Sequence, residues 1–452
     1  MVVTPSANAS PSDRTPIESP RVHRTFRAAR TAIPAPIWPA LLGVGLLFGG
    51  LDNGLGKGLI CLAAAMLLFW QIARDPIPRD MGRALLPVFS AMTLAALWGW
   101  WTSTATGLGR ALAPDLILNQ LIGLIGNTLV FTLAALIGYR RRSLERDNEW
   151  LIVFLALGLI AGLLLRLDDE TRFFVFWERA HGPRFMGTLN NANVAANVYA
   201  VVALLAFCRL LDLRTPRRNG IRRRSDKVRF WFCAAMLPLA LGAIVATGSR
   251  TTIVTVAAMS ALLIALRVAR ARGRQRSGGI MAVVVAMMLL TLLATPLAAM
   301  VSSRFDAMQE GASGRWLLWT HYADIASAAL WRGYGLGSFP MVNLRYPGTI
   351  DVAQQLWMVN SPHNIVLHFL LEGGIVFLLA HIVAAAFVLR AIGLALLYGR
   401  LRTDVTGLLA SAAIILLGAM VDIVLEVPAT AALFLTLVGL SFGQARRILG
   451  RA

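Results

Sequence analysis

The sequence predicts an all-α polytopic membrane protein with about twelve transmembrane helices. Of its 452 residues, 57% are apolar and only 15% are charged, and the mean hydropathy is +0.66. A soluble protein of this composition could not cover its surface with polar groups. A spanning helix needs about 20 apolar residues, and the chain carries a long series of such segments. The same composition excludes fibrous, disordered and disulfide-scaffold proteins.

Twelve apolar segments of roughly helical length follow one another along the chain. They lie at 36–51, 59–73, 85–101, 116–137, 150–165, 192–211, 230–247, 251–268, 280–300, 363–389, 408–427 and 429–442. Residues 1–35 are rich in Pro and Ser and then basic, without the apolar core of a signal peptide, so a disordered cytoplasmic tail is expected there. The remaining residues, 36–452, are expected to form one twelve-helix transmembrane domain.

The distribution of basic residues predicts the orientation of these spans. The chain has 43 Lys and Arg residues against 23 Asp and Glu residues, a net charge of +20. If the N-terminus is cytoplasmic, 32 of the 43 fall on cytoplasmic segments. Positively charged loops are retained in the cytoplasm, so both termini are expected on that side of a bacterial inner membrane. The basicity then indicates contact with membrane lipids, and no nucleic-acid partner is expected.

Two of the expected periplasmic loops are long. The first, 166–191, is charged and aromatic and ends in the Asn-rich run 190–193. The second, 301–362, joins the ninth and tenth spans and is too long for a simple connection. Its glycine-rich run 333–337 lacks the strand–turn–helix context of a nucleotide-binding loop and is interpreted as a flexible turn. Any chemistry is therefore expected on this external face.

His363 is the most informative single position. Ser361 and Pro362 resemble an N-cap followed by proline at the first helical position, so His363 and Asn364 are expected to begin the tenth span. A helix N-terminus disfavours positive charge and offers free N–H groups to an anion. A neutral imidazole there can accept a proton as a general base. The alternative is an interfacial histidine that only ends a loop.

Glu372 lies nine residues after His363 in the same expected helix. That spacing places it half a turn round the helix and about 13 Å deeper, so the two side chains cannot touch. His368 precedes Glu372 by four residues on the same face and is its expected partner. A carboxylate within a span should face other protein groups, and a structural role is favoured for Glu372 over a catalytic one.

Eleven basic residues lie outside the expected cytoplasmic segments, and three arginines among them are candidates for a substrate site. Arg250 follows Ser249 at the junction of the seventh and eighth spans, and Arg304 and Arg315 lie in the second long loop. Arginine suits a phosphate or pyrophosphate, because its planar guanidinium is always charged and can bind two oxygens at once. Headgroup contact is the alternative for each residue alone. Together with a histidine at a helix start, they favour an anionic lipid substrate.

Other polar residues allow further interpretations. Asp422 and Glu426, four residues apart near the outer end of the eleventh span, could line a polar cavity or form a proton site in a transporter. Against a transporter are the long external loop and the lack of an evident inverted repeat. The six histidines are scattered, and neither HExxH nor CxxC occurs, so no metal site and no other cofactor are expected.

The run His363-Asn364-x-x-Leu367-x-x-x-x-Glu372-x-Gly374 resembles the HN-x-x-L-x-x-x-x-E-x-G signature of the O-antigen ligase and polymerase superfamily. As in that family, a long loop with an Arg-Trp segment and a Gly-x-Gly segment precedes it. Two further features resemble the family: the Ser249-Arg250 junction and the run Gly187-x-x-Asn190-x-x-Asn193.

The resemblance implies an inner-membrane enzyme of the GT-C type. Such enzymes transfer a glycan from undecaprenyl pyrophosphate to an acceptor at the periplasmic face, without a nucleotide sugar or a metal. By resemblance, His363 would be the general base, while Arg250 and Arg315 would hold the pyrophosphate. Arg304 competes with Arg315 for the second position, and Asn193, Asn364 and Glu372 would support the site.

The expected function is that of an O-antigen ligase, with lipid A-core as the acceptor. Two alternatives share the same architecture: a polymerase of O-antigen or exopolysaccharide, and a protein O-oligosaccharyltransferase. These three activities differ in their acceptor. The sequence does not identify the acceptor, so the choice between the three activities stays open. The expected partners are the lipid-linked glycan donor, a saccharide or other acceptor, and membrane lipids.

Overall fold

The computed structural model describes residues 33–104, 111–167, 172–173, 177–178, 184–214, 224–270, 314–357, 359–398 and 402–450. The chain divides into residues 1–30, which lie outside the described residues, and a second unit of residues 31–452. All elements described below belong to the second unit. Nearly all of the expected tail, the expected ninth span and Arg304 lie outside the described residues.

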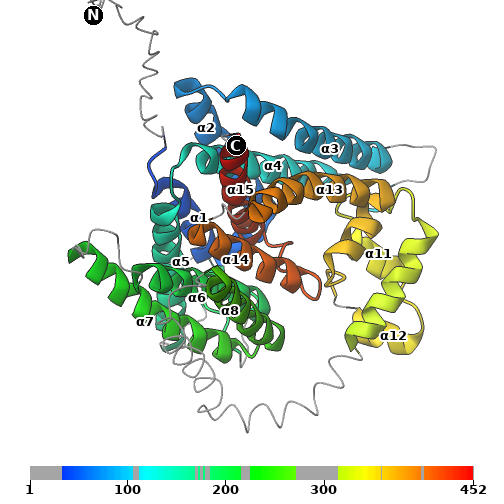
Figure 1. Cartoon of the computed structure of the whole chain (residues 1–452). Helices are drawn as coiled ribbons and strands as arrows, with labels where there is room; N and C mark the ends of the chain where they lie inside the picture. The colour runs from blue at the N-terminus through cyan, green and yellow to red at the C-terminus, as the bar shows by residue number, and fades with distance from the viewer. Residues whose placement is uncertain are drawn as a thin grey trace, which may run out of the picture. The chain divides into compact units, whose positions relative to one another are not determined.

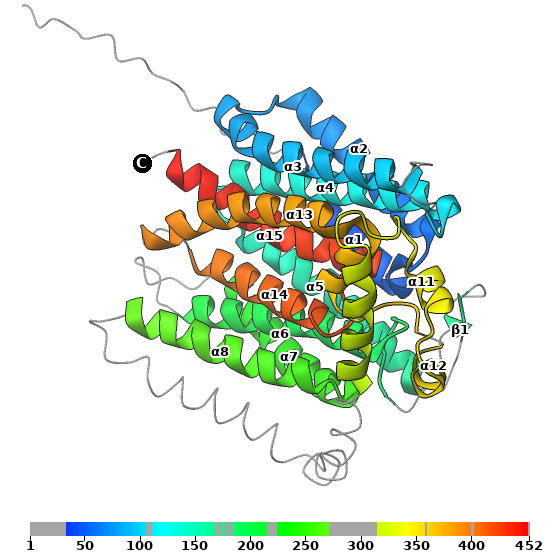
Figure 2. The ribbon, with the colours of Figure 1, turned by 90° about the vertical axis from the view of Figure 1, so that its right-hand side faces the viewer.

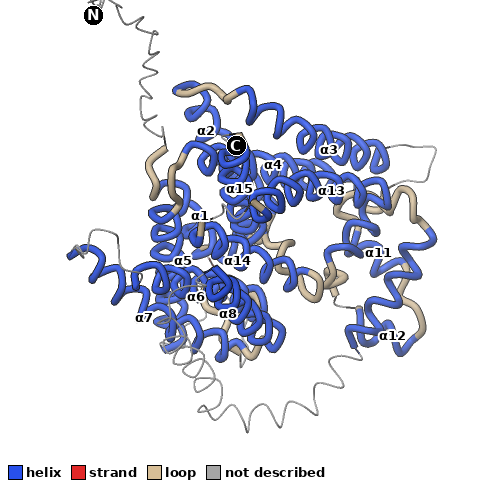
Figure 3. Tube along the Cα trace, in the orientation of Figure 1, coloured by secondary structure: helices blue, strands red, loops and turns tan. Residues whose placement is uncertain are grey.

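Helices dominate the described residues of the second unit (Figure 1, Figure 3). They are α1 (Ile37–Leu47), α2 (Gly54–Arg74), α3 (Arg79–Thr104), α4 (Ile117–Arg140), α5 (Glu145–Leu167), α6 (Ala192–Arg214), α7 (Arg224–Thr247), α8 (Arg250–Arg270), α11 (Phe339–Arg345), α12 (Ile350–Leu356), α13 (Ile365–Leu397), α14 (Thr403–Ala419) and α15 (Pro428–Leu449). Residues 314–328 are also helical. Two 3-10 turns, η1 (Gly49–Leu51) and η2 (Pro114–Leu116), precede α2 and α4. Strand β1 (Arg172–Phe173) pairs antiparallel with β2 (Trp177–Glu178).

Nine helices in the described part of the chain are long and apolar enough to cross a membrane. They are α2 to α8, α13 and α15, and the shorter apolar helices α1 and α14 coincide with two more of the expected spans. Large apolar side chains such as Leu55, Phe69 and Leu118 lie mostly exposed, as a surface against lipid requires. The prediction of an all-α polytopic membrane protein is confirmed.

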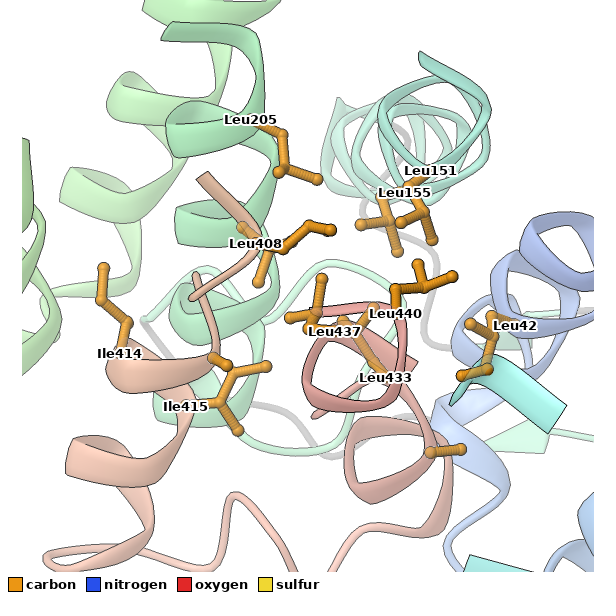
Figure 4. Close-up of a cluster of buried hydrophobic side chains, with 14 of the residues drawn as sticks. Leu42, Leu151, Leu155, Leu205, Leu408, Ile414, Ile415, Leu433, Leu437 and Leu440 are labelled. Atoms are coloured by element: carbon orange, nitrogen blue, oxygen red, sulfur yellow. The ribbon is translucent and has the colours of Figure 1, made fainter. Parts of the chain in front are cut away.

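The core lies between α15, α6 and the helices around them. Among the candidate spans, α6 and α15 are the most buried. Figure 4 shows part of this core, to which α1, α5, α6, α14 and α15 contribute Leu42, Leu151, Leu155, Leu205, Leu408, Ile414, Ile415, Leu433, Leu437 and Leu440. Helix α15 packs closely on α4 because Gly439 and Gly443 face it, and a Cβ at either position would overlap the α4 backbone. Small residues allow such close approach between helices in membranes.

Helix α13 begins two residues later than expected. Its N-cap is Asn364, whose side chain accepts hydrogen bonds from the backbone N–H groups of Val366 and Leu367. His363 precedes the helix in the left-handed region, with φ of +49°. The prediction that His363 and Asn364 begin the helix is therefore wrong. Asn is among the strongest N-capping residues, and it takes that position in preference to Ser361.

Helix α13 is also broken at Gly374, which has φ of +70°. The break separates a short half, residues 365–373, from a long half, residues 375–397. Glycine is required because of the positive φ and because a Cβ there would overlap the backbone of Trp331. The Ile375 N–H donates to Leu330 O (2.7 Å) instead of continuing the helix.

The glycine-rich run 333–337 packs against this break. The Tyr334 N–H donates to Leu371 O (2.7 Å) and the Gly335 N–H to Glu372 O (3.0 Å), and the Trp98 indole donates to Gly373 O (2.9 Å). These donors satisfy carbonyls that the break leaves without helical partners. The interpretation of the run as a flexible turn is therefore wrong.

The described part of the second long loop, residues 314–357 and 359–362, folds into a small layer of its own. Tyr322, Phe339 and Val342 form its buried centre with Leu318 and Leu371. In Figure 2, α11, α12 and β1 lie at the right-hand end of the helices, whereas the C-terminus lies at the left. The loop between α14 and α15 lies on the side of α11 and α12, and this end carries the candidate site.

Candidate functional site

The candidate site is built around Asp422, in the loop between α14 and α15. Its carboxylate is only 5% exposed and lies 3.5 Å from His363 Nδ1 and 3.5 Å from Arg315 Nη2. The Asn193 side-chain amide donates to the same carboxylate, and the Ile423 N–H donates to it over 2.8 Å. The structure thus brings together three residues that the sequence marks as candidates.

Asp422 is held in its charged form. Burial alone raises the pKa of this carboxyl, but the interactions with the His363 side chain outweigh it, together with hydrogen bonds from the Ile423 N–H and Asn193. The net effect is a pKa below the usual value of an aspartate. Asp422 is therefore a carboxylate at neutral pH and can orient the His363 ring.

His363 reaches Asp422 from a strained backbone position. A non-glycine residue in the left-handed region costs about 1–2 kcal/mol. Its N–H donates to the Ser361 hydroxyl oxygen over 3.1 Å, and the Asn364 amide donates to Met420 O over 3.0 Å. The His363 side chain remains 29% exposed. The residue is therefore fixed on one side and accessible on the other.

The Asn-rich run positions Asn193 against Asp422. The Asn191 side chain accepts from the Asn193 N–H (2.7 Å) and the Val194 N–H (3.1 Å), which orders the start of α6. Arg184 donates from Nη2 to Asn193 Oδ1 (2.7 Å) and from Nε to Thr247 O (2.6 Å). Sequence reasoning gave Arg184 no role, although it is one of the eleven basic residues outside the expected cytoplasmic segments, which was a usable signal.

Arg250 is the first residue of α8. The Ser249 and Thr252 hydroxyls lie 3.0 Å apart at this helix start. The Asn197 amide donates to Thr252 Oγ1 (3.3 Å) and to Asn193 O (2.8 Å). The N-terminus of α8 is thereby linked to the residue that holds Asp422. A helix N-terminus with an exposed arginine favours an anion.

Arg315, one of the two competing arginines in the second long loop, lies beside Asp422. It lies at the start of the helical residues 314–328, and its side chain is 44% exposed. An anion can therefore reach the guanidinium although Asp422 lies beside it. Arg304 lies outside the described residues.

A second polar cluster lies along the short half of α13. His368 Nε2 is 3.5 Å from the Glu372 carboxylate, which confirms the pairing that their spacing predicts. His368 Nδ1 is 3.6 Å from the carboxylate of Glu426, and the Ser361 hydroxyl donates to Glu426. Glu372 is buried. The structure pairs Glu372 with His368 and not with His363, as the helical spacing requires.

Fold and site together define a multi-pass helical membrane protein with a histidine, a carboxylate and arginines gathered at one end of its helices. The family model described as O-antigen ligase matches residues 233–382, which include Arg250, Arg315, His363 and Glu372. The match confirms the resemblance to the O-antigen ligase superfamily and supports, in general terms, a ligase or polymerase type of activity on lipid-linked saccharides. Asn193 and Asp422 lie outside the matched stretch. Among curated proteins, no match to the chain is found.

Proposed function

We propose that this protein is a glycosyltransferase of the bacterial inner membrane that moves a glycan from undecaprenyl pyrophosphate to an acceptor hydroxyl at the periplasmic face. O-antigen ligase, with lipid A-core as the acceptor, is the leading assignment. The observation that carries the proposal is the pairing of His363 with the buried carboxylate of Asp422, next to Arg315. The family match over residues 233–382 supports it.

His363 would act as the general base. With Nδ1 donating to Asp422, Nε2 carries the lone pair that can take the proton of the acceptor hydroxyl. The acceptor oxygen then attacks the anomeric carbon as the bond from that carbon to the pyrophosphate oxygen breaks. The electron pair of the broken bond leaves with the pyrophosphate, and a direct displacement inverts the anomeric carbon. Asp422 stabilises the imidazolium that forms.

Arg250 and Arg315 would hold the leaving pyrophosphate. Negative charge develops on its bridging oxygen, and cations fixed near that position lower the barrier. Arg315 lies 3.5 Å from the Asp422 carboxylate. A pyrophosphate carries more charge than one carboxylate, so bound donor competes for the guanidinium. If Arg315 moves towards the bound donor, the Asp422 carboxylate interacts with His363 without competition from Arg315.

Transfer assays with the purified protein in detergent test the proposal. Undecaprenyl-pyrophosphate-linked glycan is supplied as the donor with one of three acceptors: lipid A-core, a second lipid-linked glycan or an acceptor protein. We expect release of undecaprenyl pyrophosphate and appearance of the glycan on lipid A-core. Activity should persist in EDTA, because arginines take the place of a divalent ion at the pyrophosphate.

Each outcome of these assays assigns or excludes one activity. Transfer only to a second lipid-linked glycan assigns a polymerase, and transfer only to protein assigns an O-oligosaccharyltransferase. Arg315→Ala should lose transfer, whereas Arg345→Ala, which removes an exposed arginine of α11, should keep it. Failure to bind or consume the donor with every acceptor contradicts the proposal. Loss in EDTA that Mg²⁺ restores contradicts its metal-independent form.

A further inference from the structure

Glu426 receives two contacts from the segment that carries His363, although it lies in a different part of the chain. The Ser361 hydroxyl donates to Glu426 Oε1, and His368 Nδ1 lies 3.6 Å from the same oxygen. The steps proposed above assign no role to Glu426. Its contacts therefore need a separate explanation.

The first contact leads directly to the His363 backbone. The Ser361 hydroxyl accepts the His363 N–H over 3.1 Å while it donates to Glu426. A hydroxyl that donates to a carboxylate is a stronger acceptor, because hydrogen bonds in a chain polarise one another. His363 needs such support, since φ of +49° is unusual for a residue with a side chain. The Glu426 carboxylate keeps the Ser361 oxygen turned towards that N–H.

The second contact holds the Glu426 carboxylate itself in place. Both ring nitrogens of His368 face carboxylates, Nε2 towards Glu372 at 3.5 Å and Nδ1 towards Glu426 at 3.6 Å. Both distances are longer than those of ordinary hydrogen bonds, and Nδ1 has no hydrogen-bond partner, so these contacts are ion pairs. Glu372 is fixed in turn, because the Gly335 N–H donates to its backbone carbonyl at the break in α13. Glu426 is thus linked, through His368 and Glu372, to the break in α13.

We infer that Glu426 is a positioning residue for His363 and acts through Ser361. It fixes the left-handed turn at His363 so that the imidazole stays at Asp422, and it touches no substrate. The inference rests on the proposed function and adds to it a residue that neither the motif nor the matched stretch, 233–382, contains. The loop between α14 and α15 therefore supports His363 twice, through Asp422 at the side chain and through Glu426 at the backbone.

A double-mutant cycle in the transfer assay tests this inference. Ser361→Ala and Glu426→Ala should each lower kcat by about 10- to 100-fold, because small displacements of a reacting group are costly. The KM for the donor should change little. The double variant should be no slower than the slower single variant, since both changes break one chain of contacts.

Glu426→Gln keeps an acceptor for Ser361 and should retain more activity than Glu426→Ala. Asp351→Asn, an exposed carboxylate of α12, is the matched control and should change nothing.

Three results would overturn the inference: wild-type kcat in Glu426→Ala, wild-type kcat in Ser361→Ala, or losses that multiply in the double variant. If Glu426→Ala fails to reach the membrane, Ser361→Ala and Glu426→Gln decide the question alone. The His363→Ala variant separates the two proposals. Normal transfer by His363→Ala refutes the proposed function, whereas its loss together with normal transfer by Glu426→Ala refutes only the role of Glu426.

Discussion

Asp422 is buried, yet it contacts His363, Arg315 and Asn193, which come from three other parts of the chain. A buried carboxylate has to be paired, because its charge is otherwise too costly to remove from water. Here the pairing partners are the groups that the proposed reaction needs. Asp422 therefore contacts both the imidazole of His363 and the guanidinium of Arg315.

Asp422→Asn should slow transfer by about 10²–10⁴-fold while the donor still binds. The amide has nearly the same size, but it removes the charge that stabilises the imidazolium and can turn its NH₂ group towards His363. The measurement is single-turnover transfer beside an equilibrium binding assay for the donor. Unchanged turnover in a folded Asp422→Asn variant would show that His363 needs no carboxylate.

Arg250→Lys should be nearly as damaging as Arg250→Ala, with a loss of about 10²-fold or more in kcat/KM for the donor. Lysine keeps the charge but lacks the planar group that binds two phosphate oxygens. Steady-state transfer at varied donor concentration measures the effect. Wild-type turnover in the lysine variant would mean that simple charge attraction is sufficient at this position.

Several site residues could be predicted from the sequence, but not the contacts between them. The motif around His363 and the Arg-Trp and Asn-rich segments are local patterns that mark His363, Arg315 and Asn193 as candidates, and the structure places all three around Asp422. The contact between His363 and Asp422 depends on how α13 packs beside the loop between α14 and α15. No local pattern encodes that packing, so Asp422 was only one of several candidate carboxylates.

The break in α13 is the element that shapes the site. In a continuous helix, residues 365–373 would lie on the same axis as the long half. The carbonyls of Leu371 and Glu372 would then accept hydrogen bonds from N–H groups of the helix itself. The break frees them for the run 333–337. Adjacent glycines at 373 and 374 are a signal for such a break. The partner that stabilises it is far away in sequence and could not be predicted.

Gly374→Ala should destabilise the protein and reduce transfer, whereas Gly393→Ala in the same helix should do neither. Alanine at 374 meets a positive φ and the backbone of Trp331, but nothing lies within 4 Å of a Cβ at 393. The expected cost at 374 is about 1–3 kcal/mol. Thermal unfolding in detergent measures it. Equal melting temperatures for the two variants would contradict the account of the break.

The fold of the whole molecule could be predicted well because hydropathy alone determines where helices cross a membrane. Eleven of the twelve expected spans coincide with helices in the described ranges, and the remaining segment, 280–300, lies outside them. Span ends were less accurate, since capping decides them, as Asn364 shows at α13. The small layer formed by the second long loop has no periodic signal and was not predicted.

Reporter fusions test the orientation of the whole chain. A reporter at Tyr346 should lie in the periplasm and one at Arg223 in the cytoplasm, because basic segments are retained inside. A phosphatase active only in the periplasm and a fluorescent protein active only in the cytoplasm should therefore give opposite signals at the two sites. Equal signals would contradict the twelve-span orientation and place the candidate site on the wrong side for a periplasmic acceptor.

The most direct test of the central claim is the turnover of His363→Gln. Glutamine has a similar size and can still form hydrogen bonds, but it cannot take up the proton of an acceptor hydroxyl. The account predicts normal amounts in the membrane, retained binding of the lipid-linked donor, and transfer reduced by about 10²–10⁴-fold. Near-normal turnover would contradict it, because His363 would then only position other groups and the base would have to be another residue.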